Sequence, residues 1–296
     1  MSRGIGEMEF VSGLPEPVAV LAALTTALGD VWFVFLFLGV LYWFGSALPG
    51  PISLSRQKVA FVIALAFGGL AATTTLKELF QLPRPPGAAE PTGASVVPEL
   101  LLPLYSEIGA ATGYGFPSGH SVSAVVVYGG LALIVGTRRG YVSAATLILL
   151  LPVSRVVLGV HYLIDIVVGL ALGAVYLGVV YRLCGRGTNP NRALLFALAV
   201  ALVGAAIGYT TDTMLALGGT LGGRIAWGIV GGAVVDEPTT RAGGLVGAII
   251  GSAFGGLFAL VYVLDPEPYV SFIGMFVVIW GVLTAPLAGE AVARRI

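Results

Sequence analysis

The stretch FPSGH at residues 116–120 stands directly before an apolar run over residues 121–135. Proline ends the preceding segment and serine is favoured just before a helix, so a helix is predicted to begin at Ser118. Glycine lets the backbone approach a ligand closely, and histidine can transfer a proton near neutral pH. Because free N–H groups and the positive end of the dipole meet at a helix start, the stretch predicts an anion site at a membrane surface.

The composition is that of a membrane protein. Of 296 residues, 57% are hydrophobic and only 10% are charged, and the mean hydropathy is +0.97. Soluble domains carry about 25% charged residues, so we expect an all-α polytopic membrane protein. The net charge of zero does not suggest a nucleic-acid partner. The single cysteine, Cys184, excludes an internal disulfide and a cysteine metal cluster.

Apolar runs predict about nine transmembrane helices, after an interfacial segment at 18–28. We expect them at residues 30–46, 58–80, 118–137, 141–157, 162–181, 192–209, 221–235, 243–264 and 270–287. The chain then divides into an N-terminal outer or interfacial segment (1–29), a helical-bundle core (30–182) and additional C-terminal transmembrane helices (183–296).

Basic residues predict the orientation, because the cytoplasmic side of a membrane protein is enriched in Lys and Arg. Ten cations fall on one side of the expected topology: Arg56, Lys58, Arg138, Arg139, Arg182, Arg186, Arg192, Arg241, Arg294 and Arg295. The other five lie on the outer side or at outer helix ends: Arg3, Lys77, Arg84, Arg155 and Arg224. The helix start at Ser118 is predicted on the same outer side.

Residues 86–116 form a connection that is long for a compact domain. The segment contains an apolar piece at 96–108. Two interpretations of this segment are compatible with the sequence: an interfacial re-entrant helix, and a lid or lipid-entry element over the site.

Glycines recur at four-residue spacing in three predicted helices, which favours close helix contact over a ligand role. They are Gly169 and Gly173, Gly228 and Gly232, and Gly243, Gly247, Gly251 and Gly255.

Residues whose side chains could take part in catalysis or anion binding gather in three blocks on the outer side. The blocks are Lys77 with Arg84-Pro85, Pro117-Ser118-Gly119-His120, and Ser154-Arg155 with His161 and Asp165. Both histidines of the chain fall in these blocks. Any one of the cations alone is typical of a snorkelling helix-end anchor, but their joint placement on one side favours a site.

The spacing of His161 and Asp165 places both on one helix face. A carboxylate there can accept the hydrogen of one imidazole nitrogen, which leaves the other nitrogen free as a nucleophile.

Three cations and the helix start at Ser118 suit a tetrahedral dianion such as a phosphoryl group. His120 can donate a proton to a leaving oxygen. We interpret Arg224 and four further acidic residues as helix-end charges or interface anchors: Asp30, Asp212, Asp236 and Glu237.

The three blocks resemble the signature of the type 2 phosphatidic acid phosphatase superfamily, from about Lys77 to Asp165, with flanking helices over about 30–181. The resemblance implies that His161 is the nucleophile that forms a phosphohistidine, that Asp165 orients it, and that His120 protonates the leaving group. It also implies that no metal or other cofactor is needed. The implied phosphate ligands are Lys77, Arg84, Ser118, Gly119 and Arg155.

The resemblance implies a multi-pass phosphatase of the plasma membrane with an extracytoplasmic active site and a lipid phosphate or diphosphate as substrate. A site at bilayer depth beside apolar helices favours membrane lipids as partners. Nine helices also resemble the layout of glucose-6-phosphatase, so a soluble substrate such as a sugar phosphate is one alternative. A lipid phosphotransferase is another, since a phosphohistidine can transfer its group to an alcohol. The intact blocks weigh against a non-catalytic transporter or scaffold.

Overall fold

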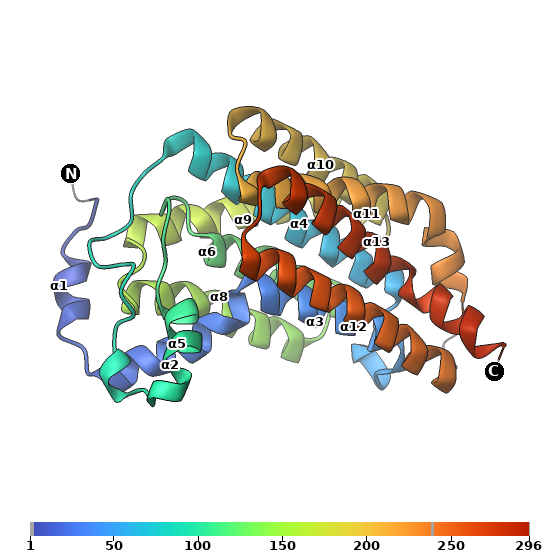
Figure 1. Cartoon of the computed structure of the whole chain (residues 1–296), viewed down its shortest axis with the longest axis horizontal. Coiled ribbons are helices and arrows are strands. Elements are labelled where there is room, and N and C mark those ends of the chain that lie inside the picture. Colours follow the sequence, from blue (N-terminus) through green and yellow to red (C-terminus); the bar gives the residue numbers. More distant parts are fainter. Residues whose placement is uncertain (1–2, 238–239, 296) are drawn as a thin grey trace.

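The computed structural model describes residues 3–237 and 240–295, and the regular structure of this part of the chain is all helical, without a β-strand (Figure 1). The helices are α1 (Glu7–Ser12), α2 (Glu16–Thr26), α3 (Val31–Phe44), α4 (Arg56–Phe80), α5 (Leu102–Gly109), α6 (Gly119–Ser123), α7 (Gly130–Val135), α8 (Arg138–Val157), α9 (Leu163–Leu183), α10 (Pro190–Ile207), α11 (Thr211–Asp236), α12 (Arg241–Leu264) and α13 (Pro268–Ala293). A π-helical turn, η6 (Ala124–Gly129), joins α6 to α7, and the 3₁₀ turns are η1 (Ala27–Gly29), η2 (Gly45–Ala47), η3 (Gly50–Ile52), η4 (Ala94–Val96) and η5 (Glu99–Leu101).

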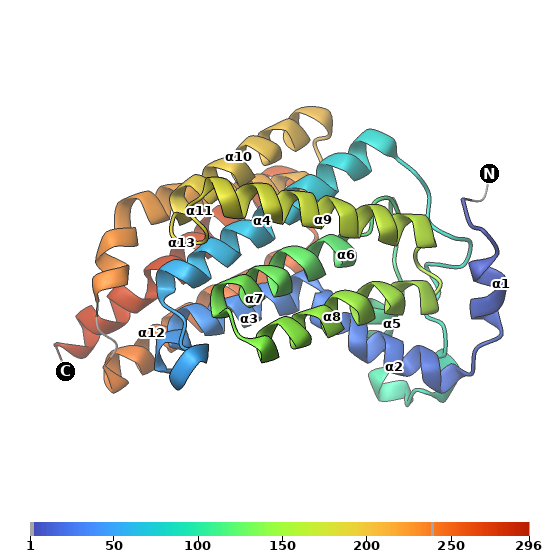
Figure 2. The same cartoon turned by 180° about the vertical axis from the view of Figure 1, so that it is seen from behind.

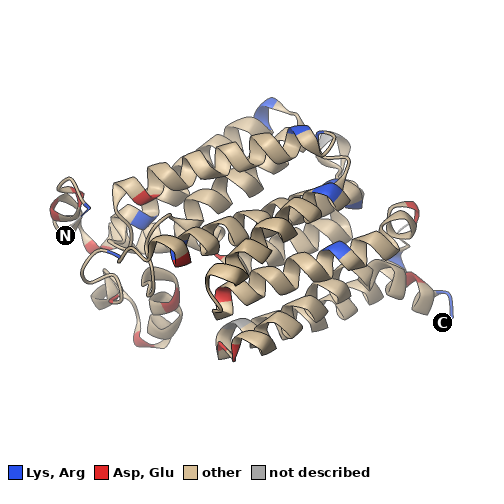
Figure 3. Ribbon diagram, turned by 90° about the horizontal axis from the view of Figure 1, so that it is seen from above, with Lys and Arg blue, Asp and Glu red and all other residues tan. Residues whose placement is uncertain are grey.

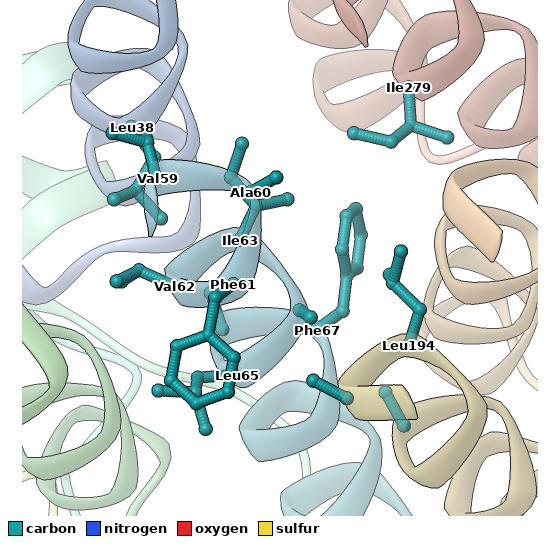
Figure 4. Packing of buried hydrophobic residues seen from close by; sticks show 14 of the residues in the cluster. Leu38, Val59, Ala60, Phe61, Val62, Ile63, Leu65, Phe67, Leu194 and Ile279 are labelled. Carbon is teal, nitrogen blue, oxygen red and sulfur yellow. The ribbon is translucent and has the colours of Figure 1, made fainter. Parts of the chain in front are cut away.

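Helix α4 is the centre of the bundle. In its most apolar window 89% of residues are buried, against 22–50% in the other long apolar helices. In Figure 4 its side chains face Leu38 of α3, Leu194 of α10 and Ile279 of α13, and Phe67 points toward the last two. Because α4 is apolar on every side and carries Lys77 in its last turn, its packing fixes the position of that lysine.

The all-helical membrane fold is confirmed, but the expected count of nine spanning helices is not. Seven helices of the described chain are long and apolar enough to span a membrane, and an eighth results if α2 and α3, bent by 50° at Asp30, count as one. The expected third helix is shorter, because the apolar helical stretch covers only Gly119–Val135. Figure 2 shows it as α6 and α7 in line between α8 and α9. The chain is a multi-pass membrane protein.

The two ends of the bundle differ in charge. Helices α4, α8, α10 and α12 begin at one end with a basic first turn or flank, and α9 and α13 finish there. In Figure 3 most cations lie toward this end, whereas acidic residues gather toward the end that carries the N-terminus. The expected grouping of ten cations at one end therefore agrees with the directions of the helices.

Helix α11 begins ten residues earlier than the expected span at 221–235. Its first half contains Gly218 and Gly219, which weaken a helix prediction but here allow close packing. A Cβ atom on Gly218 would lie 2.2 Å from the carbonyl oxygen of Phe272 in α13. The expectation that Arg224 lies at a helix end is wrong, because it stands in the middle of α11.

The spaced glycines support close packing at most but not all positions. Cβ atoms on Gly169 and Gly173 would clash with the α6–η6 segment, at 2.7 Å from the carbonyl oxygen of Ser118 and 2.9 Å from Val125. Gly232 is exposed and a Cβ atom there would meet nothing within 4 Å, so the expectation of a packing role is wrong for this residue.

We expect Gly218→Val to lower the midpoint of thermal unfolding in detergent, because the new side chain would meet backbone atoms of α13. Overpacking of this kind costs about 1–3 kcal/mol. Gly232→Val is the matched control on the same helix, and its midpoint should stay near that of the wild type. Equal midpoints for the two variants would contradict the close contact between α11 and α13.

Candidate active site

A cavity of about 210 Å³ lies where α4, α6 and α8 meet, close to the end of α4. Six of the eight predicted site residues line it: Lys77, Arg84, Gly119, His120, Arg155 and His161. The other two, Ser118 and Asp165, are fully buried. The structure therefore brings together residues from all three blocks, which span positions 77–165 of the chain.

His161 lies in the connection between α8 and α9, and both nitrogens of its ring contact other side chains. Nδ1 lies 3.3 Å from Oδ2 of Asp165, and Nε2 lies 3.0 Å from Nη1 of Arg84. Since a guanidinium can only donate, the network assigns the proton to Nδ1 and leaves a lone pair on Nε2. Burial, reinforced by the nearby cations, lowers the pKa of His161 well below its ordinary value. The imidazole is therefore neutral at pH 7, as a nucleophile must be.

Asp165, in the first turn of α9, joins several segments of the site. Its Oδ2 accepts a hydrogen bond from the backbone N–H of Tyr162 at 3.0 Å, and its Oδ1 forms an ion pair with Arg3. Its backbone oxygen accepts from the N–H of Ser118 at 3.0 Å. The carboxylate is thereby balanced and fixed, because a buried charge needs a partner and hydrogen bonds.

The start of α6 is held against its neighbours. The Ser118 hydroxyl accepts from the N–H of Ser121 at 3.4 Å and so caps the helix. His120 Nε2 lies 2.9 Å from Oδ1 of Asp30, at the bend between α2 and α3. The ring fits there because a Cβ atom on Gly29 would lie only 2.8 Å from it.

Backbone carbonyls position the two arginines. Arg84 donates from Nε to the carbonyl oxygen of Thr112 at 2.8 Å, and from Nη1 to that of Val160 at 3.0 Å. Burial and the nearby Arg155 lower the pKa of Arg84 to about 10, so the group remains protonated at neutral pH. Arg155 donates from Nη1 to the carbonyl oxygen of Ile108 at 3.3 Å. The segment 86–116 thus helps to position both arginines through its backbone carbonyls.

The same segment has an interfacial face. Tyr105 of α5 is buried against α2, whereas Leu100 and Leu104 are 90% and 60% exposed. Exposed leucines beside a membrane protein's polar end are typical of residues at the lipid interface.

Sequence reasoning missed three residues at the site. Asp30 and Asp212 stand at the starts of α3 and α11, as expected of helix-end charges, but both also line the cavity. Arg3 contacts Asp165 from a position 162 residues away. The only signal for Arg3 was its place among the cations of the outer side, and no spacing connected it to a block.

The arrangement suits phosphoryl chemistry. Among the described residues, no group of three or more His, Cys, Asp and Glu side chains is placed to hold a metal ion. The groups that line the cavity include three cations, Lys77, Arg84 and Arg155, and two imidazoles. Together they can bind a tetrahedral dianion, offer a nucleophilic nitrogen and supply a proton to a leaving oxygen.

Comparisons with known proteins agree with this chemistry. The sequence model of the PAP2 superfamily matches residues 57–188. The chain is 30% identical over 152 residues to decaprenylphosphoryl-5-phosphoribose phosphatase of Mycobacterium tuberculosis, an alignment that covers 51% of this chain and 75% of that protein. It is 31% identical over 84 residues to phosphatidylglycerophosphatase B of Bacillus subtilis, which covers 25% of this chain and 41% of that protein. No solved structure matches the chain significantly. The chain therefore belongs to the PAP2 superfamily and is a membrane phosphatase, a hydrolase of phosphoric monoesters.

Proposed function

We propose that the protein hydrolyses a lipid phosphate or diphosphate through a phosphohistidine on His161. The observation that carries the proposal is the neutral imidazole, held between Asp165 and Arg84 and facing a cavity with three cations. The relatives from M. tuberculosis and B. subtilis are named as phosphatases of lipid-linked phosphate esters, which supports a lipid substrate.

In the first step, Nε2 of His161 attacks phosphorus and the bond from phosphorus to the ester oxygen breaks. His120 donates a proton to that oxygen, which leaves as an alcohol, and Asp30 beside the ring balances its positive charge while it is protonated. Asp165 accepts a hydrogen bond from Nδ1–H of His161 and stabilises the positive charge that the imidazole gains.

In the second step, water attacks the phosphohistidine, and His120 takes a proton from that water. The nitrogen–phosphorus bond breaks and inorganic phosphate is released. Lys77, Arg84 and Arg155 stabilise the negative charge on the phosphoryl oxygens in both steps. Gly119 and the start of α6 supply backbone N–H groups, and Ser118 completes the predicted set of phosphate ligands.

We expect His161→Ala to lower phosphate release from a lipid phosphate by on the order of 10⁴-fold or more, since the nucleophile is lost. The assay uses purified protein in detergent with EDTA, and the wild type should remain active under these conditions. Phosphate and phosphoryl-alcohol products are both measured, which separates hydrolysis from transfer to an alcohol. Wild-type turnover by the folded variant would contradict the assignment of His161.

Arg3 is proposed as a positioning residue. It forms an ion pair with Asp165, donates to the carbonyl oxygen of Pro83 and lies over the rings of Phe116 and Tyr162, at 5.6 and 5.0 Å. It therefore holds the carboxylate that orients His161 and balances part of its charge.

We expect Arg3→Gln to lower kcat by about tenfold, a loss typical of outer-shell partners of catalytic groups. Removing the cation leaves the Asp165 charge less balanced, which favours the protonated form of His161. The acid limb of the pH–rate profile should therefore move to higher pH. Arg3→Lys keeps the charge and should restore the position of that limb. A lower yield of Arg3→Gln with an unchanged kcat and pH profile would indicate a purely structural role.

We further propose that the protein lies in the plasma membrane with its active site on the extracytoplasmic side. The support is the positive-inside rule, since the basic end of the bundle is opposite the cavity. Glu90 is exposed near the cavity end, and Thr188 is exposed at the basic end, between α9 and α10.

In a Cys184→Ala background, a cysteine at position 90 should react in intact cells with a membrane-impermeant maleimide. A cysteine at position 188 should react only after permeabilisation. The opposite pattern would overturn the proposed orientation without affecting the assignment of the catalytic residues.

A further inference from the structure

A second cavity, of about 140 Å³, lies between α3, α12 and α13. Its lining is apolar and aromatic, and includes Trp32 and Trp43 of α3, Phe258 of α12 and Ile279 of α13. The indole N–H of Trp43 is occupied, because it donates to the carbonyl oxygen of Val282 at 3.1 Å. This lining suits a hydrocarbon ligand, which gains dispersion contacts and needs no hydrogen-bond partner.

Phe35 of α3 lines both this cavity and the catalytic cavity. Its ring packs against Phe67 of α4, with ring centres 4.4 Å apart, and against Phe258 of α12 at 6.1 Å. The apolar cavity therefore begins where the catalytic cavity ends, with one aromatic side chain between them.

The direction of the apolar cavity also fits a membrane lipid. Its wall follows α3 from Trp32 to Trp43, which are eleven positions and about 16 Å of helix apart. Helix α3 starts next to Asp30 at the catalytic cavity and runs toward the basic end of the bundle, as Figure 1 lets the reader follow beside α12. A chain in this cavity would extend from the phosphate site into the depth of the bilayer.

The glycines of α12 indicate that the space is unfilled. A Cβ atom on Gly247 would lie 3.1 Å from the carbonyl oxygen of Ala285, and one on Gly251 would lie 2.1 Å from the ring of Trp43. On Gly255, which lines the cavity, a Cβ atom would meet nothing within 4 Å. The spacing continues, but the last glycine faces a void, and an empty apolar void loses packing contacts.

We propose that this cavity binds the hydrocarbon chain of the substrate, so that α12 and α13 form the chain-binding site while residues of α4, α6 and α8 hold the phosphate. This proposal rests on the proposed lipid phosphatase activity and adds to it the role of the C-terminal helices. A bulky side chain at Gly255 would take the place of part of the bound chain.

The test compares Gly255→Leu with Gly256→Leu, a matched control. Gly256 is the next residue of α12, is exposed, and also has nothing within 4 Å of its Cβ position. Each variant is assayed with a long-chain lipid phosphate, a short-chain homologue and a water-soluble aryl phosphate. For Gly255→Leu we expect kcat/KM to fall about tenfold or more for the long chain, equivalent to the lost burial of about two methylene groups. The aryl phosphate rate of Gly255→Leu and all three rates of Gly256→Leu should stay near wild type.

The possible results separate two failures. If the wild type releases phosphate from none of the lipid substrates, the proposed function is wrong. If it hydrolyses them and Gly255→Leu retains the wild-type preference for the long chain, the chain-binding site is wrong and the phosphatase assignment stands. A nonspecific bilayer lipid in the cavity would give this second result.

A binding measurement tests the occupancy of the cavity without relying on turnover. In His161→Ala protein, a lipid phosphate with a brominated chain should quench tryptophan fluorescence, and less so after Trp43→Phe is added. An unbrominated lipid phosphate should reverse the quenching, whereas a neutral lipid of the same chain length should not. Equal quenching with and without Trp43 would overturn the proposal.

Discussion

The arrangement of the active site depends on one buried carboxylate. Asp165 is fully buried, and its oxygens contact Arg3, His161 and the N–H groups of Tyr162 and Ser118. A charge in such a place is tolerated only when it is paired and hydrogen-bonded. Through its carboxylate and its backbone oxygen, Asp165 therefore brings the N-terminal segment, the start of α6 and the start of α9 to one point.

The sequence allowed the core of this site to be predicted because its information is local. His161 and Asp165 are four residues apart, and Ser118 caps the helix that it precedes. The missed contacts are long-range. Arg3 is 162 residues from Asp165, and Asp30 is 90 residues from His120. No periodicity links such positions, so only the packing of α1, α2 and α3 around the core brings them together.

The fold could be predicted to a similar depth. Apolar runs gave the helices and their directions, because a long run without water must satisfy its backbone hydrogen bonds internally. Two of the errors concern glycine. Because Gly218 weakens the helix prediction, the first ten residues of α11 were not predicted as helix. Gly255 was expected to pack against a neighbouring helix but faces a cavity. The spacing of glycines predicts which face of a helix has no side chains. Whether another helix packs against that face depends on segments far away in the sequence.

The charges of the cavity link the core to the C-terminal helices. Three cations at the end of an apolar bundle would repel one another in a medium that screens charge poorly. Asp30 comes from the bend before α3, and Asp212 comes from the first turn of α11, at the exposed rim. Asp30 thus pairs with His120, and Asp212 compensates part of the charge of Lys77 and Arg84 before phosphate arrives. Helix α11, which follows the core, therefore contributes a negative charge to the site. A substrate bound at the cations would lie beside this helix.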